Sequence, residues 1–463
     1  MNISKSIFKA YDIRGIVEKD LTSEVVFFVG KVFGKKMTKM GLKKCVIGRD
    51  ARASGLLLRE ALVEGLQSNN IKVLDLGVVP TPIVYFATHY FNTGTGIVIT
   101  GSHNPPQYNG LKMMLNDEPF WGEQIKELFK QVVSLSKSET KNKKFKYSDV
   151  ENFFLDSVYI SEVCKKIRIS RSLRIVVDAG NGVAGKVACE LYKKMGCDVT
   201  EMYCEPLGSF PNHHPDPADP ANLTELIEMV KENNFDVGLA FDGDGDRLGV
   251  VTGSGEIIWP DRQLMLFAAE ILTNKPKSTV IFDVKCSRKL PEWIIKHNGV
   301  PLMWKTGHSL MKAKLKETRA AIAGEMSGHF FFNDDWFGFD DAIYAGARLL
   351  RILSKEKNIT STLEELPNSI STPEIKLETG NMEPLEIINQ LMNVNCFPNA
   401  NEKIFVDGVR AEYTGGFGLV RASNTTPILV LRFEGDTYEI IKKIKDEFRL
   451  EIKKIKNDLI FNF

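Results

Sequence analysis

The chain has 463 residues, a length that favours several domains over one core, and its 43% apolar content is ordinary for a globular protein. Sixty basic and 59 acidic residues leave a formal net charge of +1, so no global field attracts nucleic acid or an anionic membrane. The seven cysteines are never spaced as CxxC, which argues against a disulfide framework or a zinc site. We find no signal sequence and no apolar run long enough to cross a bilayer, and we expect a cytoplasmic protein.

Three segments of the chain repeat one pattern, in which a strand is followed by a helix and then by two further strands with a helix between them. The first strands are predicted at residues 46–50, 175–180 and 280–285. The helices that follow are predicted at residues 54–68, 182–195 and 287–297. The second strands are predicted at residues 72–76, 198–202 and 300–304, and the third at residues 97–99, 237–241 and 320–323.

Strands that alternate with helices predict mixed, mostly parallel sheets with right-handed crossovers. The last hundred or so residues differ and are typical of a smaller α+β unit, with strands at 403–407 and 428–433 and a helix at 437–454. The fold class is therefore α/β, with three similar α/β domains and a C-terminal α+β domain. Composition places the four domains at residues 1–149, 150–252, 253–367 and 368–463.

The loop at residues 100–105 follows the apolar run 96–99, so Ser102 lies at the end of a predicted strand. An isolated serine at such a place is most often a turn residue that bonds its own backbone. Here His103 and Asn104 can bond phosphate oxygens, and Lys112 follows closely. A serine nucleophile needs activation, which a metal and nearby cations supply.

The loop at residues 242–247 also follows an apolar run and carries Asp242, Asp244 and Asp246 at alternate positions. A calcium EF-hand begins similarly but needs glycine at its sixth position and an acid at its twelfth, where this chain has Arg247 and Gly253. Three adjacent carboxylates repel one another and demand a cation. We expect Mg²⁺ bound by the three aspartates and by an oxygen of a phosphate on Ser102.

The third strand of the third repeat leads into Glu325 and Ser327, which suit the vicinal hydroxyls of a sugar, although Glu325 alone would pass for an ordinary turn acid. His103, His308 and His329 lie in glycine-bearing loops at strand ends, where functional histidines are common. The other four histidines are expected to be structural or solvated. Near the C-terminus, Arg421 precedes three hydroxyls and an amide, a set that can surround a phosphate.

In this combination the chain resembles the α-D-phosphohexomutase family, in its bacterial phosphomannomutase/phosphoglucomutase branch. The resemblance runs over essentially the whole length, from the segment 8–15 through the four loops in family order. It implies four domains around a central cleft, Ser102 as the phosphorylated serine and the three aspartates as magnesium ligands. Glu325 and Ser327 would hold the sugar, and the non-reacting phosphate would be held by Arg421, Ser423, Asn424 and Thr425. Seven further residues match positions that line the family's cleft: Tyr11, Arg14, Lys112, Arg247, Lys285, His308 and His329.

The resemblance also implies a reaction, the reversible exchange of hexose 1-phosphate and hexose 6-phosphate, of mannose or glucose, through a 1,6-bisphosphate. Arg247 is expected to supply electrostatic support, and the proton transfers are assigned to His329 and Lys112, with His308 as the alternate. The expected cofactors are Mg²⁺ and a hexose 1,6-bisphosphate as activator.

The expected partner is a small phosphosugar, with no nucleic acid or membrane, and the chain is expected to be a monomer or a weak homodimer. Three other readings stay open: a phosphoglucosamine mutase, a metal-dependent sugar phosphatase that lets water finish the transfer, and a silent phosphosugar-binding protein. Met326 argues against the first, because phosphoglucosamine mutases usually carry glutamine there.

Overall fold

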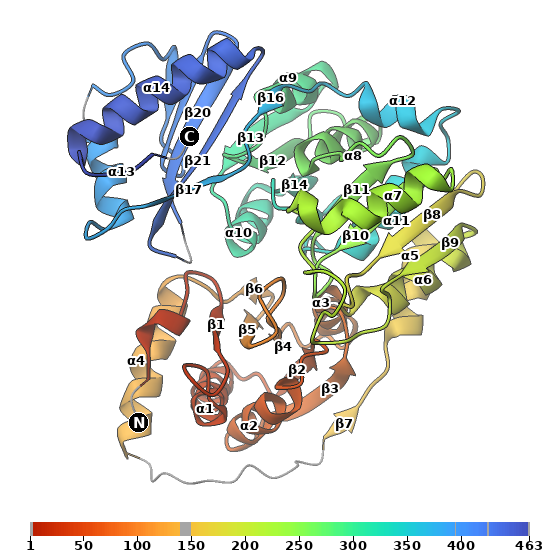
Figure 1. Cartoon of the computed structure of the whole chain (residues 1–463). Coiled ribbons are helices and arrows are strands. Elements are labelled where there is room, and N and C mark those ends of the chain that lie inside the picture. Colours follow the sequence, from red (N-terminus) through yellow and green to blue (C-terminus); the bar gives the residue numbers. More distant parts are fainter. Residues whose placement is uncertain (1–2, 139–149, 394, 424–425, 462–463) are drawn as a thin grey trace. The chain divides into compact units, whose positions relative to one another are not determined.

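The computed structural model describes residues 3–138, 150–393, 395–423 and 426–461 (Figure 1). The chain divides into two compact units, one formed by Met1–Pro260 with Ser327–Glu365 and the other by Asp261–Met326 with Leu366–Phe463. Within the described ranges, no helix has both the length and the apolar character needed to span a bilayer.

The first unit begins with a seven-stranded sheet in the order β1-β5-β4-β2-β3-β7, with β6 beside β5. Strands β4, β2, β3 and β7 run parallel, whereas β5 and β1 run antiparallel to their neighbours. The strands are β1 Ile13–Ile16, β2 Lys44–Arg49, β3 Lys72–Val78, β4 Gly96–Ile99, β5 Tyr108–Leu115, β6 Glu118–Pro119 and β7 Glu151–Asn152. The accompanying helices are α1 Ser23–Lys39, α2 Gly55–Gln67, α3 Thr81–Tyr90 and α4 Glu123–Ser138. Every residue of β4 is buried, as expected for a strand in the middle of a covered sheet.

A second sheet in the same unit has the order β11-β10-β8-β9, parallel except for the pair β10 and β11. Its strands are β8 Arg174–Asp178, β9 Asp198–Met202, β10 Val237–Phe241 and β11 Leu248–Thr252. The helices that follow it in the chain or pack near it are α5 Asp156–Lys166, α6 Ala184–Met195, α7 Thr224–Glu232, α11 Ala342–Leu353 and α12 Ile359–Glu364. The strand β15 Phe330–Phe332 precedes α11.

Helix α11 is anchored to α5 and α6 of the first unit. Its N-cap residue Asp341 accepts the backbone N–H of Tyr344 at 2.9 Å and the hydroxyl of Tyr159 on α5 at 2.9 Å. Tyr192 on α6 donates its hydroxyl to the carbonyl oxygen of Ile343 at 2.9 Å. These buried bonds join residues about 150 to 180 positions apart to one core.

The second unit contains the parallel strands β13-β12-β14, namely β12 Thr279–Asp283, β13 Val300–Trp304 and β14 Ile322–Gly324. The helices of this part are α8 Pro260–Asn274, α9 Lys289–Lys296 and α10 His308–Thr318. The order strand, helix, strand, helix, strand is the same as in the first two sheets.

The C-terminal part of this unit has an antiparallel sheet in the order β16-β21-β20-β19-β18, with β17 paired to β21, and two helices, α13 and α14 (Figure 1). The elements are β16 Ile370–Ser371, β17 Ile375–Glu378, α13 Pro384–Asn393, β18 Glu402–Ile404, β19 Val409–Tyr413, β20 Gly416–Ala422, β21 Ile428–Gly435 and α14 Tyr438–Ile455. Phe448 of α14 is fully buried in the core that its helix shares with the sheet.

The predicted fold class is confirmed, because three α/β segments with mixed sheets are followed by an α+β segment. The strand predicted at 403–407 is shorter and ends at Ile404. Beyond this strand, the carboxylate of Asp407 accepts the backbone N–H of Thr306 at 3.1 Å and the guanidinium of Arg421 at 2.9 Å instead of continuing the ladder.

Candidate active site

Ser102 lies in the loop that follows β4, as predicted, and its side chain faces the acidic loop. The residue has a positive φ of 49°, which is uncommon for residues other than glycine, and it is only 3% exposed. Its hydroxyl donates to Oδ2 of Asp242 at 2.9 Å and lies 3.1 Å from Nδ1 of His103. The backbone N–H of Ser102 bonds the hydroxyl of Thr100 at 2.7 Å. The serine hydroxyl is therefore held beside a carboxylate and does not bond the backbone of its own turn.

The three aspartates lie in the turn between β10 and β11, and all are buried. Oxygen atoms of Asp242, Asp244 and Asp246 lie within 4.8 Å of one another. Gly243 allows the close approach of the serine loop, because a Cβ at this position would lie 2.4 Å from the carbonyl oxygen of Ser102. The alternation of acid and glycine thus serves two needs, a cluster of carboxylates and a backbone that fits against the serine.

The charge of the carboxylate cluster is balanced from within the first unit. Lys112 on β5 donates to Oδ2 of Asp244 at 2.7 Å and also to Asp246. Thr81, the first residue of α3, donates its hydroxyl to the same Oδ2 atom of Asp244 at 2.6 Å. Burial lowers the pKa of Lys112, but the two aspartates outweigh burial and raise it above its ordinary value. The lysine is therefore a firmly charged ammonium in this arrangement.

The aspartates differ in pKa because their neighbours differ. Burial, together with the charges of Asp246 and Asp244, raises the pKa of Asp242 well above its usual range. Burial also acts to raise the pKa of Asp246, but Lys112 and His329 outweigh it and hold that pKa well below the usual range. A cation would relieve the repulsion that disfavours the charged form of Asp242.

The residues present fit a divalent cation. Among the described residues, Oδ1 of Asp244 is buried and has no hydrogen-bond partner, a costly state for a carboxylate oxygen unless a cation completes it. Carboxylate and hydroxyl oxygens are hard donors, which suit Mg²⁺ or Ca²⁺ better than a soft metal. The cluster with Ser102 can therefore hold a hard metal ion.

Further predicted residues lie near the carboxylate cluster or the serine loop. Nε of Arg247 lies 3.4 Å from Nε2 of His329, which in turn lies 3.2 Å from Oδ1 of Asp246. The hydroxyl of Ser327 lies 2.9 Å from Nδ1 of His329, so Ser327, which the resemblance assigns to the sugar, contacts the histidine here. At the other end of the serine loop, Arg14 donates to the carbonyl oxygen of Thr100 at 2.8 Å. Tyr11 is half-buried in the segment before β1.

The second unit gathers another set of predicted residues on its own loops. Nζ of Lys285 donates to Oε1 of Glu374 at 2.7 Å, and this charge lowers the pKa of Glu374 to about 2. Glu325, at the end of β14, is buried and accepts the backbone N–H of Gly307 at 2.5 Å. His308, the first residue of α10, is also buried.

Arg421 lies near the end of β20 in the same unit, with Nε on Asp407. Within the described part of the chain, its buried Nη2 atom has no hydrogen-bond partner, so the guanidinium has a donor to offer an anion. Ser423 accepts the backbone N–H of Thr426 at 3.3 Å. Asn424 and Thr425, also predicted to bind the phosphate, lie outside the described residues.

The chain matches the domains of one protein family, and individual known proteins, over almost its whole length. The phosphoglucomutase/phosphomannomutase alpha/beta/alpha domains I, II and III match residues 5–139, 154–255 and 259–370, and the C-terminal domain of the same family matches residues 374–451. The chain belongs to the phosphoglucomutase/phosphomannomutase family.

Individual family members are similar over their full lengths. A phosphoglucomutase of Neisseria gonorrhoeae is 48% identical over 455 residues, covering 98% of each chain. A phosphomannomutase/phosphoglucomutase of Pseudomonas aeruginosa is 46% identical over 455 residues, covering 98% of this chain and 97% of that protein. A crystal structure of a phosphoglucomutase/phosphomannomutase family protein from Burkholderia thailandensis matches all of both chains with a TM-score of 0.93 and 46% identity. The predicted resemblance is confirmed.

Sequence reasoning missed several side chains that support the family's predicted site residues. Thr81 binds Asp244, Asp407 binds Arg421, and Glu374 binds Lys285. Buried Arg410 donates to the carbonyl oxygens of Val284 and Cys286, on either side of Lys285, at 2.7 Å each. None of these residues stands in one motif with its partner, because the two lie between 14 and 163 positions apart in the sequence.

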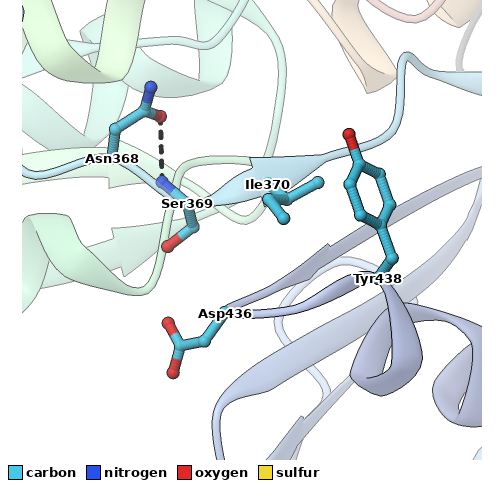
Figure 2. Close-up of a pocket in the computed structure, with 5 residues that line it drawn as sticks. All are labelled: Asn368, Ser369, Ile370, Asp436 and Tyr438. Carbon is cyan, nitrogen blue, oxygen red and sulfur yellow. Dashed lines mark hydrogen bonds between the residues drawn. The ribbon is translucent and has the colours of Figure 1, made fainter.

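A pocket of about 430 Å³ lies in the second unit, lined by Asn368, Ser369, Ile370, Asp436 and Tyr438 (Figure 2). None of the predicted site residues lines it. Figure 2 shows the side chain of Asn368 turned onto the backbone N–H of Ser369, at 2.9 Å. The carboxylate of Asp436 is paired with Arg288 and lies 3.4 Å from Lys289, so its charge is balanced by the protein itself. The pocket offers no set of groups for phosphoryl transfer.

Proposed function

We propose that this chain interconverts hexose 1-phosphates and hexose 6-phosphates, of glucose, mannose or both, by way of a phosphate on Ser102. The observation that carries the proposal is the 2.9 Å contact between the Ser102 hydroxyl and Asp242 inside a buried cluster of three carboxylates. The family to which the chain belongs supports the same reaction, since three relatives at 45%, 46% and 48% identity are named phosphoglucomutase or phosphomannomutase/phosphoglucomutase.

The ion that we propose for the cluster is Mg²⁺, held by Asp242, Asp244, Asp246 and an oxygen on Ser102. When bound, it neutralises the charge of a phosphate on the serine and favours attack on phosphorus. Lys112 adds a fixed positive charge on the protein side, and Arg247 adds another near His329. These cations face a group that carries about −2 charge at neutral pH.

The transfer breaks the bond between phosphorus and the Ser102 oxygen and forms a bond to a free hydroxyl of the sugar. The sugar hydroxyl loses a proton, and we assign this transfer to His329, whose ring is oriented by Ser327 on one nitrogen and Asp246 on the other. The Ser102 oxygen gains a proton as its bond to phosphorus breaks, and we assign this second transfer to Lys112, with His308 as the predicted alternate. The bisphosphate then presents its other phosphate to Ser102. The serine hydroxyl gives up its proton as it bonds to phosphorus, and the sugar oxygen that leaves this phosphorus gains a proton.

Binding of the sugar and of its non-reacting phosphate is proposed for the second unit. Glu325 offers a buried carboxylate to hydroxyl groups, and Arg421 offers a donor without a hydrogen-bond partner among the described residues. Lys285 and the segment 423–425 complete the proposed phosphate contacts, and Tyr11 and Arg14 of the first unit are proposed as further contacts.

The four predicted domains then divide the work into a phosphoserine domain at 1–149, a metal-binding domain at 150–252, a sugar-binding domain at 253–367 and a phosphate-binding domain at 368–463. A hexose 1,6-bisphosphate is the proposed activator, because it can phosphorylate Ser102. We also propose that the enzyme works in the cytoplasm. We propose further that it is a monomer or a weak homodimer, and sedimentation of the purified protein would test this oligomeric state.

The experiment that tests the function is an assay of glucose 1-phosphate and mannose 1-phosphate side by side. Each reaction contains a trace of the matching 1,6-bisphosphate, with and without Mg²⁺, and both the 6-phosphate and inorganic phosphate are measured. Formation of the 6-phosphate that is lost in Ser102→Ala supports the proposal. Release of inorganic phosphate without an isomer would instead identify a phosphatase, and full activity in Ser102→Ala would overturn the phosphoserine.

A further inference from the structure

Beneath the Ser102 loop lies a buried arginine, Arg52, which is only 1% exposed. Its guanidinium donates to three backbone carbonyl oxygens of the loop, those of Ser102 at 2.8 Å, Asn104 at 2.6 Å and Pro105 at 2.6 Å. No predicted role in the reaction falls on this residue. The planar fork of arginine suits several acceptors at once, whereas a lysine would offer a single ammonium.

Asp50 holds both the arginine and the start of the loop. Its Oδ2 atom accepts Nε of Arg52 at 3.0 Å, the hydroxyl of Thr100 at 2.8 Å and the backbone N–H of Gly101 at 2.8 Å. The Thr100 hydroxyl in turn accepts the backbone N–H of Ser102 at 2.7 Å. Both ends of the serine backbone are thus tied to one buried ion pair.

The loop is built to lie on this guanidinium. A Cβ at Gly101 would lie 2.2 Å from Nε of Arg52, so only glycine lets the backbone approach so closely. On another side, the ring of Phe210 lies 5.0 Å from the guanidinium carbon. The guanidinium is thus packed between the loop backbone and the ring of Phe210.

We infer that Arg52 is a positioning residue for phosphoryl transfer, which holds the Ser102 backbone at its positive φ so that the hydroxyl faces Asp242. The inference rests on the proposed function. Arg52 acts through the backbone of Ser102, so its loss is expected to lower kcat and to leave KM for the sugar nearly unchanged. A misplacement of about 1 Å at a reacting group costs about 100-fold in rate.

The test compares Arg52→Lys and Arg52→Met with a matched control, Arg59→Met. Arg59 is a second buried arginine of the same domain and donates to Asp75 at 2.7 Å, away from the serine loop. For each protein we would measure kcat and KM for glucose 1-phosphate with a trace of glucose 1,6-bisphosphate, the phosphate content by intact mass, and the melting temperature. All three substitutions are expected to lower the melting temperature, since each disturbs a buried ion pair.

The expected result is a kcat lowered by about tenfold or more in Arg52→Lys, with KM within about twofold of the wild type, and a normal kcat in Arg59→Met. A normal kcat in Arg52→Lys, a loss confined to KM, or an equal loss of kcat in the control would overturn the inference. If the arginine variants do not fold, Gly101→Ala decides by the same criteria, because its Cβ displaces the guanidinium without removing it. A wild type that makes no 6-phosphate would refute the proposed function instead.

Discussion

The contact between Gly243 and the serine loop predicts a large effect from one added methyl group. In Gly243→Ala the new Cβ would lie 2.4 Å from the carbonyl oxygen of Ser102. A carbon and an oxygen that are not bonded approach to about 3.3 Å, so the two loops must separate by about 0.9 Å. The separation would draw the Ser102 hydroxyl away from Asp242, whose oxygen it now contacts at 2.9 Å.

The expected cost follows from this displacement. A shift of about 1 Å at a reacting group lowers the rate by about 100-fold, which corresponds to about 2.7 kcal/mol in the activation free energy. Overpacking costs folding stability as well, by about 1–3 kcal/mol. The rate and the stability are therefore measured on the same preparation, kcat by the formation of glucose 6-phosphate and stability by urea unfolding.

The control is Gly55→Ala, at the first position of α2. There the nearest atom to the added Cβ would be the flexible Arg49 side chain at 3.3 Å, which can move aside. Gly55→Ala is expected to keep the wild-type kcat. The reasoning would be refuted by a Gly243→Ala protein that is phosphorylated on Ser102 and has a kcat within about threefold of the wild type. Such a result would mean that the two loops are not closely packed at this contact.

Three further predictions concern other parts of the molecule. Arg421→Ala is expected to raise KM for both the 1-phosphate and the 6-phosphate by about 10- to 100-fold, because a lost hydrogen bond to a charged group costs about 1.5–3 kcal/mol. An unchanged KM would show that Arg421 does not bind the phosphate. Dialysis against a chelator is expected to abolish isomerisation, and added Mg²⁺ is expected to restore it. The Asp244→Asn variant should need about tenfold more Mg²⁺ than the wild type for its half-maximal rate. Equal Mg²⁺ requirements in the variant and the wild type would count against the metal site. Burial raises the pKa of Asp341 to about 7 from 3.8, so between these values the folded state keeps a proton that the unfolded state has lost. The free energy of unfolding should therefore fall as the pH rises from about 4 to 7, by at most about 1.4 kcal/mol per pH unit relative to Asp341→Asn in urea titrations, and a difference of the opposite sign would contradict this pKa.

The parts of the fold that were predicted correctly depend on local sequence. The three repeats show as apolar runs separated by helical patterns, and the strands at 97–99 and 237–241 are buried throughout. Ser102 and the three aspartates can also be recognised from local sequence, because the serine with its polar neighbours lies in one loop and the three aspartates lie together in another. Their mutual contact follows from the general position of ligand groups at the carboxyl ends of parallel strands.

The residues that sequence reasoning missed share a different property, namely that their partners are distant in the chain. Arg52 and Ser102 are separated by 50 positions, and Thr81 and Asp244 by 163. A buried arginine or a threonine at a helix start has many other uses, so neither carries a local signal. The hydroxyl of Ser327 lies 2.9 Å from Nδ1 of His329, a contact that its motif did not indicate, and its contact with the sugar stays a prediction.

Helix α11 has a consequence for how this chain can be cut. The family's third domain matches residues 259–370, yet the segment Ser327–Glu365 within it belongs to the first compact unit. A fragment excised at 259–370 would carry α11 without Tyr159 and Tyr192, and Asp341 would lose its tyrosine donor. Such a fragment would expose the apolar face of α11 to solvent and is expected to aggregate. Expression of this segment alone, or its exchange between relatives, should therefore succeed only when residues 150–260 are included.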